Sequence, residues 1–337
     1  MSEPNALTRT PSGAWMGAPP PRGQLVAGFA AVYILWGSTY LAIRYAVESF
    51  PPFVMAGTRH LAAGLILFAF LRARGVALPE RRHWRSALVI GGFLLLGGNG
   101  LVSWAEQRVP SGLASLIVAS VPLWMALVQG IQRRRRPPLP VVAGLLVGLA
   151  GLVLLVIPGR FGGAGHVDPI GAAALLFAAL SWVIGSLYSR RAALPSSTLL
   201  TIAMEMIAGG SLLWLCGLAL GEGARLHFAA ISLRSVLSLA YLIVFGSLIG
   251  FSAYIWLLKV TTPARVTTYA YVNPLVAVLL GWAVAGEALT LRIGIATAGI
   301  VGAVALIIRY GGETMPAAGL ESGAAPATER PLAERAS

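Results

Sequence analysis

Long apolar runs separated by short turns constrain the fold of this chain more than any other feature. The runs are roughly 18 to 22 residues long, which is the length at which an α-helix crosses the hydrocarbon core of a bilayer. The sequence is 57% hydrophobic and only 11% of its 337 residues are charged, against about 25% in a soluble globular domain. The chain is therefore expected to be an all-α integral membrane protein that crosses the bilayer many times.

Ten candidate transmembrane helices can be placed along the chain. They cover about 24–46, 53–71, 86–105, 112–131, 140–157, 170–188, 198–219, 236–257, 265–285 and 291–309. Turn-forming stretches such as SFPPF at 49–53 separate several of them. The first run is too long for the apolar core of a signal peptide, so we expect it to be retained. The tails, 1–22 and 311–337, are rich in Ala, Pro, Gly, Ser and Glu and are expected to be disordered.

Arginines and lysines in the short loops predict the orientation, because cytoplasmic loops retain basic residues. If the N-terminus is inside, the inner loops hold 13 of these residues and the outer loops hold 5. Both tails are therefore expected to be cytoplasmic. The four arginines of IQRRRRPPLP (131–140) are interpreted as a topology anchor that also attracts anionic lipid. Nucleic-acid binding is not expected, because no solvated basic face accompanies the run.

Weak internal similarity predicts two inverted repeats. A shift of 146 residues sets LWGSTYLAIRYA (35–46) on SWVIGSLYSRRA (181–192), so that Trp36 matches Trp182. A shift of 152 sets PL at 122–123 on PL at 274–275. Five helices in each half force the second half into the membrane upside down, an arrangement typical of alternating-access transporters. A duplicated membrane scaffold without a cargo is the alternative.

The stretch WGSTYLAIRYAVESFPPFVMAGTRHLAAGLIL (36–67), together with the Pro-Leu helices and the Gly-rich fifth and tenth helices, resembles the EamA-like family of the drug/metabolite transporter superfamily. The resemblance divides the chain into a first repeat at 23–158 (helices 1–5) and a second at 168–310 (helices 6–10). It implies a ten-helix carrier of the inner cell membrane that exports amino acids, other metabolites or toxic compounds.

Together these features predict a secondary active transporter of the inner membrane. It is expected to export a small amino acid-like metabolite or a drug-like solute by alternating access. A passive channel or facilitator with the same fold is the alternative. The sequence has no H-E-x-x-H motif, no Gly-rich phosphate loop and no nucleophile–base arrangement, so neither an enzyme, a metal site nor a cofactor is expected.

Charges inside the predicted helices are the first candidates for transport, since each costs roughly 2.5 to 3.5 kcal/mol at the bilayer centre. Arg59 and Glu205 coincide under the shift of 146, but we expect roughly 12 Å of depth between their backbones. Arg59 is assigned to an outer gate, with Glu106 or Glu48 as its partner. Glu205 is assigned to an inner gate or to proton coupling, because desolvation brings a carboxyl group toward physiological pH. A purely structural role for both residues is equally open.

Aromatic and amide side chains complete the predicted substrate site. Aromatic rings can hold amphipathic or cationic solutes by stacking and cation–π contact, although the same rings could instead form an interfacial belt. The candidates are Trp36, Tyr40, Asn99, Trp104, Tyr254, Trp256, Tyr271 and Asn273. Pro122 and Pro274 are expected in mid-helix at equivalent repeat positions, where each is a candidate hinge or a simple bend.

Small residues predict one close helix contact. Gly144 and Gly148 form a G-x-x-x-G pattern on the fifth helix, and Gly299 and Gly302 answer it on the tenth. Small residues let helix backbones approach each other, so we expect these glycines to pack neighbouring helices. A homodimer interface is the alternative, and both a monomer and a homodimer stay open.

Overall fold

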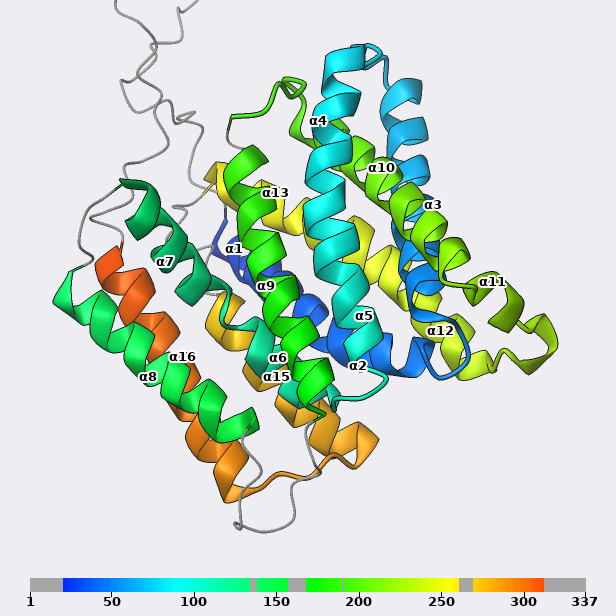
Figure 1. The fold of residues 1–337 in the computed structure, drawn as a ribbon. Helices are drawn as coiled ribbons and strands as arrows, with labels where there is room; N and C mark the ends of the chain where they lie inside the picture. The colour runs from blue at the N-terminus through cyan, green and yellow to red at the C-terminus, as the bar shows by residue number, and fades with distance from the viewer. Residues whose placement is uncertain (1–20, 134–137, 157–167, 190, 261–268, 312–337) are drawn as a thin grey trace, which may run out of the picture.

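The computed structural model describes residues 21–133, 138–156, 168–189, 191–260 and 269–311 (Figure 1). Within these ranges every regular element is a helix, and three of the spans contain π-helical segments, labelled η1, η2 and η4. The helices are α1 (Arg22–Ala30), η1 (Ala31–Leu35), α2 (Trp36–Ala46), α3 (Pro52–Ala73), α4 (Arg81–Gly91), η2 (Gly92–Gly100), α5 (Leu101–Ala105), α6 (Ser111–Val118), α7 (Val121–Arg133), α8 (Leu139–Val156), α9 (Pro169–Ser189), α10 (Thr198–Ala219), α11 (Glu222–Arg225), the short 3-10 turn η3 (Phe228–Ala230), α12 (Leu233–Tyr241), η4 (Leu242–Ile249), α13 (Gly250–Val260), α15 (Tyr269–Ala285) and α16 (Leu291–Gly311).

Seven helical stretches in the described residues are long and apolar enough to cross a membrane. They are Arg22–Ala46, Pro52–Ala73, Arg81–Ala105, Ser111–Gln132, Pro169–Ser189, Thr198–Ala219 and Leu233–Tyr254. Three shorter apolar helices, Leu139–Leu154, Val272–Ala285 and Leu291–Ile307, fall where the fifth, ninth and tenth spans are predicted. An all-α membrane protein is therefore confirmed, whereas the count of ten spans stays a prediction. The basic run at 134–136 lies outside the described residues.

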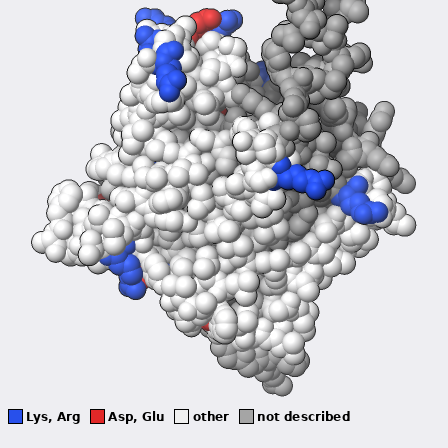
Figure 2. All heavy atoms as spheres, turned by 180° about the vertical axis from the view of Figure 1, so that it is seen from behind, with Lys and Arg blue, Asp and Glu red and all other residues white. Residues whose placement is uncertain are grey.

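The surface of the bundle is apolar over most of its area. Figure 2 shows the basic side chains of the visible face mainly toward its edges, with a broad uncharged surface between them. Leu65, Ile66 and Phe70 on α3 are each about half exposed, and they would lose water contact only against lipid or another protein. Such a surface fits the hydrocarbon region of a bilayer.

Local chemistry explains several helix boundaries. Pro52 occupies the first position of α3, where its missing N–H is not needed. Ser197 caps α10 by accepting a hydrogen bond from the backbone N of Leu200 at 3.3 Å, and Ser232 caps α12 through the backbone N of Ser235 at 3.1 Å. These caps satisfy backbone donors that the first turn of a helix leaves unpaired.

The two predicted hinge prolines occupy different positions in their helices. Pro274 lies inside α15, as expected. Pro122 does not lie in mid-helix: α6 ends at Val118, and α7 begins at Val121. Pro122 therefore falls in the first turn of α7, where a proline fits without removing an intrahelical hydrogen bond. The fourth span is thus broken just before Pro122 rather than kinked at it.

Two pairs of helices pack closely along their lengths, α3 with α10 and α8 with α16 (Figure 1). Glycines allow both contacts. A Cβ at position 64 would lie 2.9 Å from the backbone N of Ile207, and one at position 144 would lie 3.1 Å from the carbonyl oxygen of Ala303. A Cβ at Gly148 would meet Leu123 and Ala303. The glycine pattern of the fifth helix therefore packs a neighbouring helix, as predicted.

Candidate functional site

A central cavity of about 170 Å³ lies where helices from the two predicted halves meet. Its walls come from α2, α3, η2, α5, α6 and α7 of the first half and from α9, α13 and α15 of the second. An engineered cavity of about 150 Å³ holds benzene. This cavity can therefore hold a single ring with a small substituent.

Seven of the twelve predicted site and hinge residues line this cavity. They are Trp36, Tyr40, Arg59, Asn99, Pro122, Asn273 and Pro274. Residues from five separate helices are thus brought to one space, although nothing in the sequence links them directly.

Four other predicted residues do not line the cavity. Trp104 lies under the guanidinium of Arg108, at 4.7 Å from ring centroid to Cζ. Trp256 packs beside Gly28, and Tyr254 packs against the ring of Trp36. Glu205 belongs to α10, which packs against α3 and α4. For the twelfth residue, Tyr271, the side chain is outside the described part of the structure.

Trp36 is the centre of an aromatic cluster at one wall of the cavity. Its ring lies 5.2 Å from the ring of Phe251, 5.2 Å from Tyr254 and 5.1 Å from Tyr269, between centroids. Its Nε1 donates a hydrogen bond to the carbonyl oxygen of Gly246 at 3.2 Å. Edge and tilted contacts of this kind hold aromatic rings in fixed orientations, so Trp36 presents a rigid surface to the cavity.

Arg59 brings a positive charge to the cavity wall. The residue is only 5% exposed, and its Nε donates to the Oγ of Ser247 at 3.0 Å. Within the described residues no carboxylate oxygen lies within 4.0 Å of its nitrogens. Glu48 is not its partner, because Glu48 pairs with Arg234. The expected pair with Glu106 is also not formed, although the two groups lie close enough to interact electrostatically.

Sequence reasoning missed several residues of the cavity wall. The missed polar and aromatic residues are Thr39, Ser115, Trp182, Phe251 and Tyr269. A signal existed for Trp182, which matches Trp36 under the shift of 146. His60, which does not line the cavity, was also missed: it is completely buried next to Arg59 and lies close to the Asn99 side chain.

Most acidic residues of the described structure lie in the turns and helix ends at one end of the bundle (Figure 1). This acidic end is defined by Glu48, Glu106, Asp168, Glu222 and Glu287. Glu287 caps α6 by accepting hydrogen bonds from the backbone N of Ser111 at 2.7 Å and from the backbone N of Gly112 at 2.9 Å. Arg44 approaches the same carboxylate at 3.7 Å. A residue of the second half thus caps α6, a helix of the first half.

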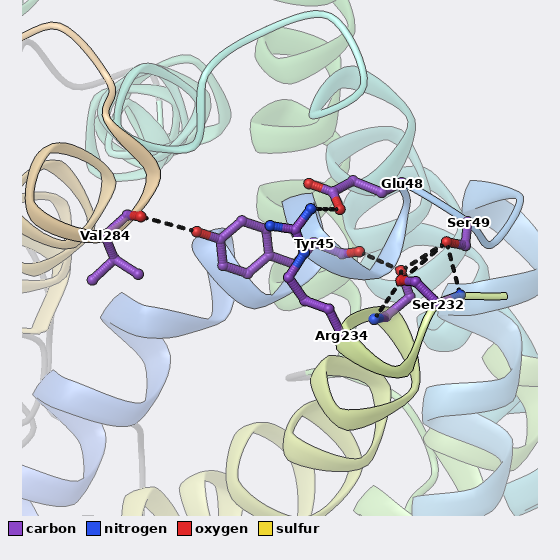
Figure 3. A network of polar contacts seen from close by, with 7 residues as sticks. Tyr45, Glu48, Ser49, Ser232, Arg234 and Val284 are labelled. Atoms are coloured by element: carbon purple, nitrogen blue, oxygen red, sulfur yellow. Dashed lines mark hydrogen bonds and ion pairs between the residues drawn. The ribbon is translucent and has the colours of Figure 1, made fainter.

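Further polar contacts join the two halves at the acidic end (Figure 3). The guanidinium of Arg234 pairs with Glu48 and lies 4.6 Å from the ring centroid of Tyr45. The hydroxyl of Tyr45 donates to the carbonyl oxygen of Val284 at 3.3 Å. Ser235 donates to the carbonyl oxygen of Tyr45 at 2.7 Å. These contacts tie the end of α2 to the start of α12 and the end of α15.

Glu106 differs from the other carboxylates of the acidic end. It lies just beyond the span Arg81–Ala105, is 1% exposed, and neither of its oxygens has a hydrogen-bond partner in the described residues. Burial raises the pKa of this carboxyl group well above its ordinary value, and the nearby Glu287 raises it further. Burial of an unpaired carboxylate favours its neutral form.

The site residues do not suggest a metal centre. In the part of the chain that the structure describes, no group of three or more His, Cys, Asp or Glu side chains lies where it could hold a metal ion. The cavity instead offers aromatic faces, amide and hydroxyl groups and one guanidinium. Such a lining is suited to holding a small organic molecule.

The EamA-like transporter family model matches residues 23–157 and matches again at residues 169–309. The chain belongs to the EamA-like transporter family. A relative described as the uncharacterized inner membrane transporter YedA of Escherichia coli strain K12 is 43% identical over 287 residues, which cover 84% of this chain and 90% of the relative. The uncharacterized transporter YvbV of Bacillus subtilis strain 168 is 25% identical over 273 residues, 81% of this chain and 88% of the relative.

A solved crystal structure has the same fold. It is 26% identical in sequence, with a TM-score of 0.58 over 84% of this chain and 96% of that chain. As a member of the EamA-like family with relatives named as inner membrane transporters, the protein is a membrane transporter. The predicted family resemblance is thereby confirmed.

Proposed function

We propose that this protein is a secondary active transporter that binds a small solute in the central cavity and exports it across the inner membrane by alternating access. The solute is an amino acid-like metabolite or a drug-like molecule. The observation that carries the proposal is the cavity itself, which residues of both predicted halves enclose. A substrate site at the interface between two repeats is what alternating access requires.

The cavity wall supports an inverted repeat. Trp36 and Trp182, which match under the shift of 146, both line the cavity. Pro122 and Pro274, which match under the shift of 152, line it as well. Equivalent positions of two repeats meet around a pseudo-two-fold axis when the repeats face each other. The pairing of these residues fits that arrangement.

Helix packing supports the same arrangement. The two closest helix pairs, α3 with α10 and α8 with α16, each join helices that the repeat makes equivalent, the second with the seventh and the fifth with the tenth. The first span contacts α12 and η4, and correspondingly α9, the sixth, contacts α4 and η2. The π-helical segments η2 and η4 also occupy matching places in the third and eighth spans. Such segments are rare and often mark functional sites.

The contacts at the acidic end are of a kind that can break when the two halves of the protein separate. Ion pairs and hydrogen bonds of Arg234, Tyr45 and Glu287 join the two halves there. The Arg234–Glu48 pair is exposed. An exposed ion pair contributes only about 0–1 kcal/mol, so water can replace it when the halves separate. On the proposed topology, with both termini in the cytoplasm, this end faces the outside.

Transport assays in proteoliposomes test the proposal against a passive channel. A carrier is expected to show saturable uptake and counterflow, in which unlabelled solute inside accelerates entry of labelled solute. The variant Trp36→Ala should lose most of this exchange. Trp282→Ala, at a position that is 54% exposed outside the cavity, is the matched control and should retain it. Flux that rises linearly with concentration, without counterflow, would establish the channel instead.

Proton coupling through Glu205 is the remaining part of the proposal. Its position on α10, away from the cavity wall, would require coupling through helix movement rather than direct contact with the solute. An imposed pH gradient should drive uptake in the original protein and not in Glu205→Gln. Equal responses of both proteins to the gradient would remove Glu205 from the proposal.

A further inference from the structure

The charge of the cavity wall restricts the solute that it can hold. Among the described residues Arg59 is the one charged side chain that lines the cavity. The other polar groups of the wall are neutral hydroxyls, amides and indoles. The lining therefore carries a net positive charge, which attracts an anion and repels a cation. The inference below rests on the proposed function, because it names the chemical class of the solute in the same cavity.

The guanidinium of Arg59 has donors to spare. It has five N–H groups, of which the structure pairs the one on Nε with the Oγ of Ser247 at 3.0 Å. Both terminal nitrogens lack a hydrogen bond or an ion pair within the described residues. Charged groups removed from water are strongly destabilising unless they are paired and hydrogen-bonded. A bound anion would supply the missing partner.

The carboxylates of the acidic end do not fill this role in the structure. Glu48 pairs with Arg234, and Glu287 accepts hydrogen bonds from Ser111 and contacts Arg44. Glu106 is buried without a hydrogen bond. None of the ion pairs within 4.0 Å in the described residues joins it to Arg59. The carboxylates that could neutralise Arg59 are thus engaged elsewhere or out of reach.

Space for the guanidinium is provided by a glycine of η4. A Cβ at Gly246 would lie 3.0 Å from Nη2 of Arg59 and 2.9 Å from Cγ2 of Thr39. Both side chains line the cavity. The guanidinium is therefore held from two sides, by Ser247 through a hydrogen bond and by close packing at Gly246, and its position at the wall is fixed.

The remaining wall suits a flat apolar group. Trp36, Phe251 and Tyr269 form one aromatic surface, and Trp182 contributes another ring from α9. A volume of about 170 Å³ leaves room for one ring and a short chain. Planar groups stack favourably on aromatic faces.

We propose that Arg59 binds the carboxylate of a small anionic solute whose flat apolar body lies against Trp36. The arginine fork matches a carboxylate with two parallel hydrogen bonds, which a lysine ammonium cannot reproduce. The chemical class is therefore a monocarboxylate with an aromatic or similarly planar body. Cationic amphipathic solutes, which aromatic walls alone would also accept, are disfavoured by the charge of Arg59.

Three probes with the same ring test the inference: 3-phenylpropanoate, 3-phenylpropanamide and 3-phenylpropylamine. Their binding to the purified full-length protein is measured by isothermal titration calorimetry. The carboxylate should bind about tenfold tighter than the amide, because charge-assisted hydrogen bonds are roughly twice as strong as neutral ones. Arg59→Gln should remove this difference, and Arg59→Lys should reduce it. Arg225→Gln, which removes an exposed arginine outside the cavity, is the matched control and should keep it.

Ser247→Ala covers the case in which Arg59 variants do not fold. This change leaves the guanidinium in place but removes its hydrogen bond, so the preference for the carboxylate should fall by several-fold. An amide or amine that binds as tightly as the carboxylate overturns the inference. The carrier proposal then stays intact, because the cavity binds a solute of a different chemical class. Absence of binding by all three probes also overturns it, and the carrier proposal is then decided separately by the counterflow assay.

Discussion

At the scale of single residues, the cavity depends on side chains whose neighbours lie far away in the sequence. Trp36 is held by Gly246 and Phe251, which follow it by more than 200 positions. Arg59 is held by Ser247, and Glu106 is buried without a hydrogen-bond partner, beyond salt-bridge distance of Arg59. A buried carboxyl group without a partner favours its neutral form, so the charge of Arg59 has no counter-ion among the described residues.

Replacing Gly246 with alanine tests how closely Arg59 is held. The new methyl group would lie 2.9 Å from Thr39 and 3.0 Å from Arg59, so the helix or the guanidinium must shift. We expect a loss of about 1–3 kcal/mol in the free energy of unfolding, typical of overpacking, and a fall in transport. Gly294→Ala, where a Cβ would meet nothing within 4 Å, should keep or raise stability. Equal thermal unfolding of Gly246→Ala and the original protein would contradict the close packing.

Replacing Glu106 with glutamine tests the buried carboxyl group. Because the pKa of Glu106 is raised in the folded state, its contribution is most favourable below the ordinary value of 4.5 and is lost as pH rises toward the folded pKa. Unfolding temperatures of Glu106→Gln and of the original protein should therefore diverge above about pH 4.5, in favour of the variant. The groups that face Glu106 are Arg44, Arg59, Tyr40 and Glu287, and they are the same in both proteins. A difference that stays constant from pH 4 to pH 8 would contradict the assignment.

At the scale of helices, the two halves hold each other's ends. Glu287, which follows α15, caps α6, and Glu222 in α11 accepts a hydrogen bond from the backbone N of Val54 at 2.9 Å in α3. Asp168, ahead of α9, pairs with Arg108 at 3.2 Å. A carboxylate at a helix start satisfies free N–H groups and interacts favourably with the helix dipole. These interactions are local in space but cross between the predicted repeats.

Replacing a glycine of α8 tests the close packing of this helix. Gly148→Ile would drive a side chain into Leu123 and Ala303, since a Cβ there already lies 2.8 Å and 3.1 Å from their atoms. We expect α8 and α16 to separate and the free energy of unfolding to fall by about 1–3 kcal/mol or more. Gly302→Ile is the control, because a Cβ at Gly302 meets nothing within 4 Å. Greater instability of Gly302→Ile would instead indicate a contact with a second copy of the chain.

At the scale of the whole molecule, the two ends of the bundle differ in charge. At the acidic end Arg44, Arg108 and Arg234 pair with three of the five carboxylates. The loop between α3 and α4 at the other end holds Arg72, Arg74, Arg81 and Arg82 against the single carboxylate of Glu80. Basic residues favour the cytoplasmic side. Polar contacts join the two halves at the acidic end, so the proposed alternating access requires that these contacts break (Figure 3).

Thiol labelling in intact cells tests the orientation of the two ends. Cysteines are introduced at Leu291, which is 81% exposed near the acidic end, and at Leu78, which is 68% exposed in the loop after α3. The natural Cys216 is first replaced with serine. A membrane-impermeant reagent should label position 291 and leave position 78 unlabelled until the cells are opened. Labelling of both positions in intact cells would contradict the inverted topology.

The sequence by itself determined the membrane-spanning class and the family. Span length, turn residues and loop arginines act along the chain, so they can be read without knowledge of the fold. The glycine spacing on the fifth helix can also be recognised without the fold, because residues four apart share one helix face. The match between Trp36 and Trp182 is likewise visible in the sequence alone.

Only the tertiary structure decided which side chains meet. It pairs Glu48 with Arg234, places Trp104 against Arg108 and Tyr254 against Trp36, and leaves Arg59 at the cavity wall. The reason is physical. Sequence periodicity indicates which residues share a helix face, but the rotation of each helix about its axis depends on packing against helices that are distant in the sequence. A residue faces a cavity, another helix or lipid according to that rotation.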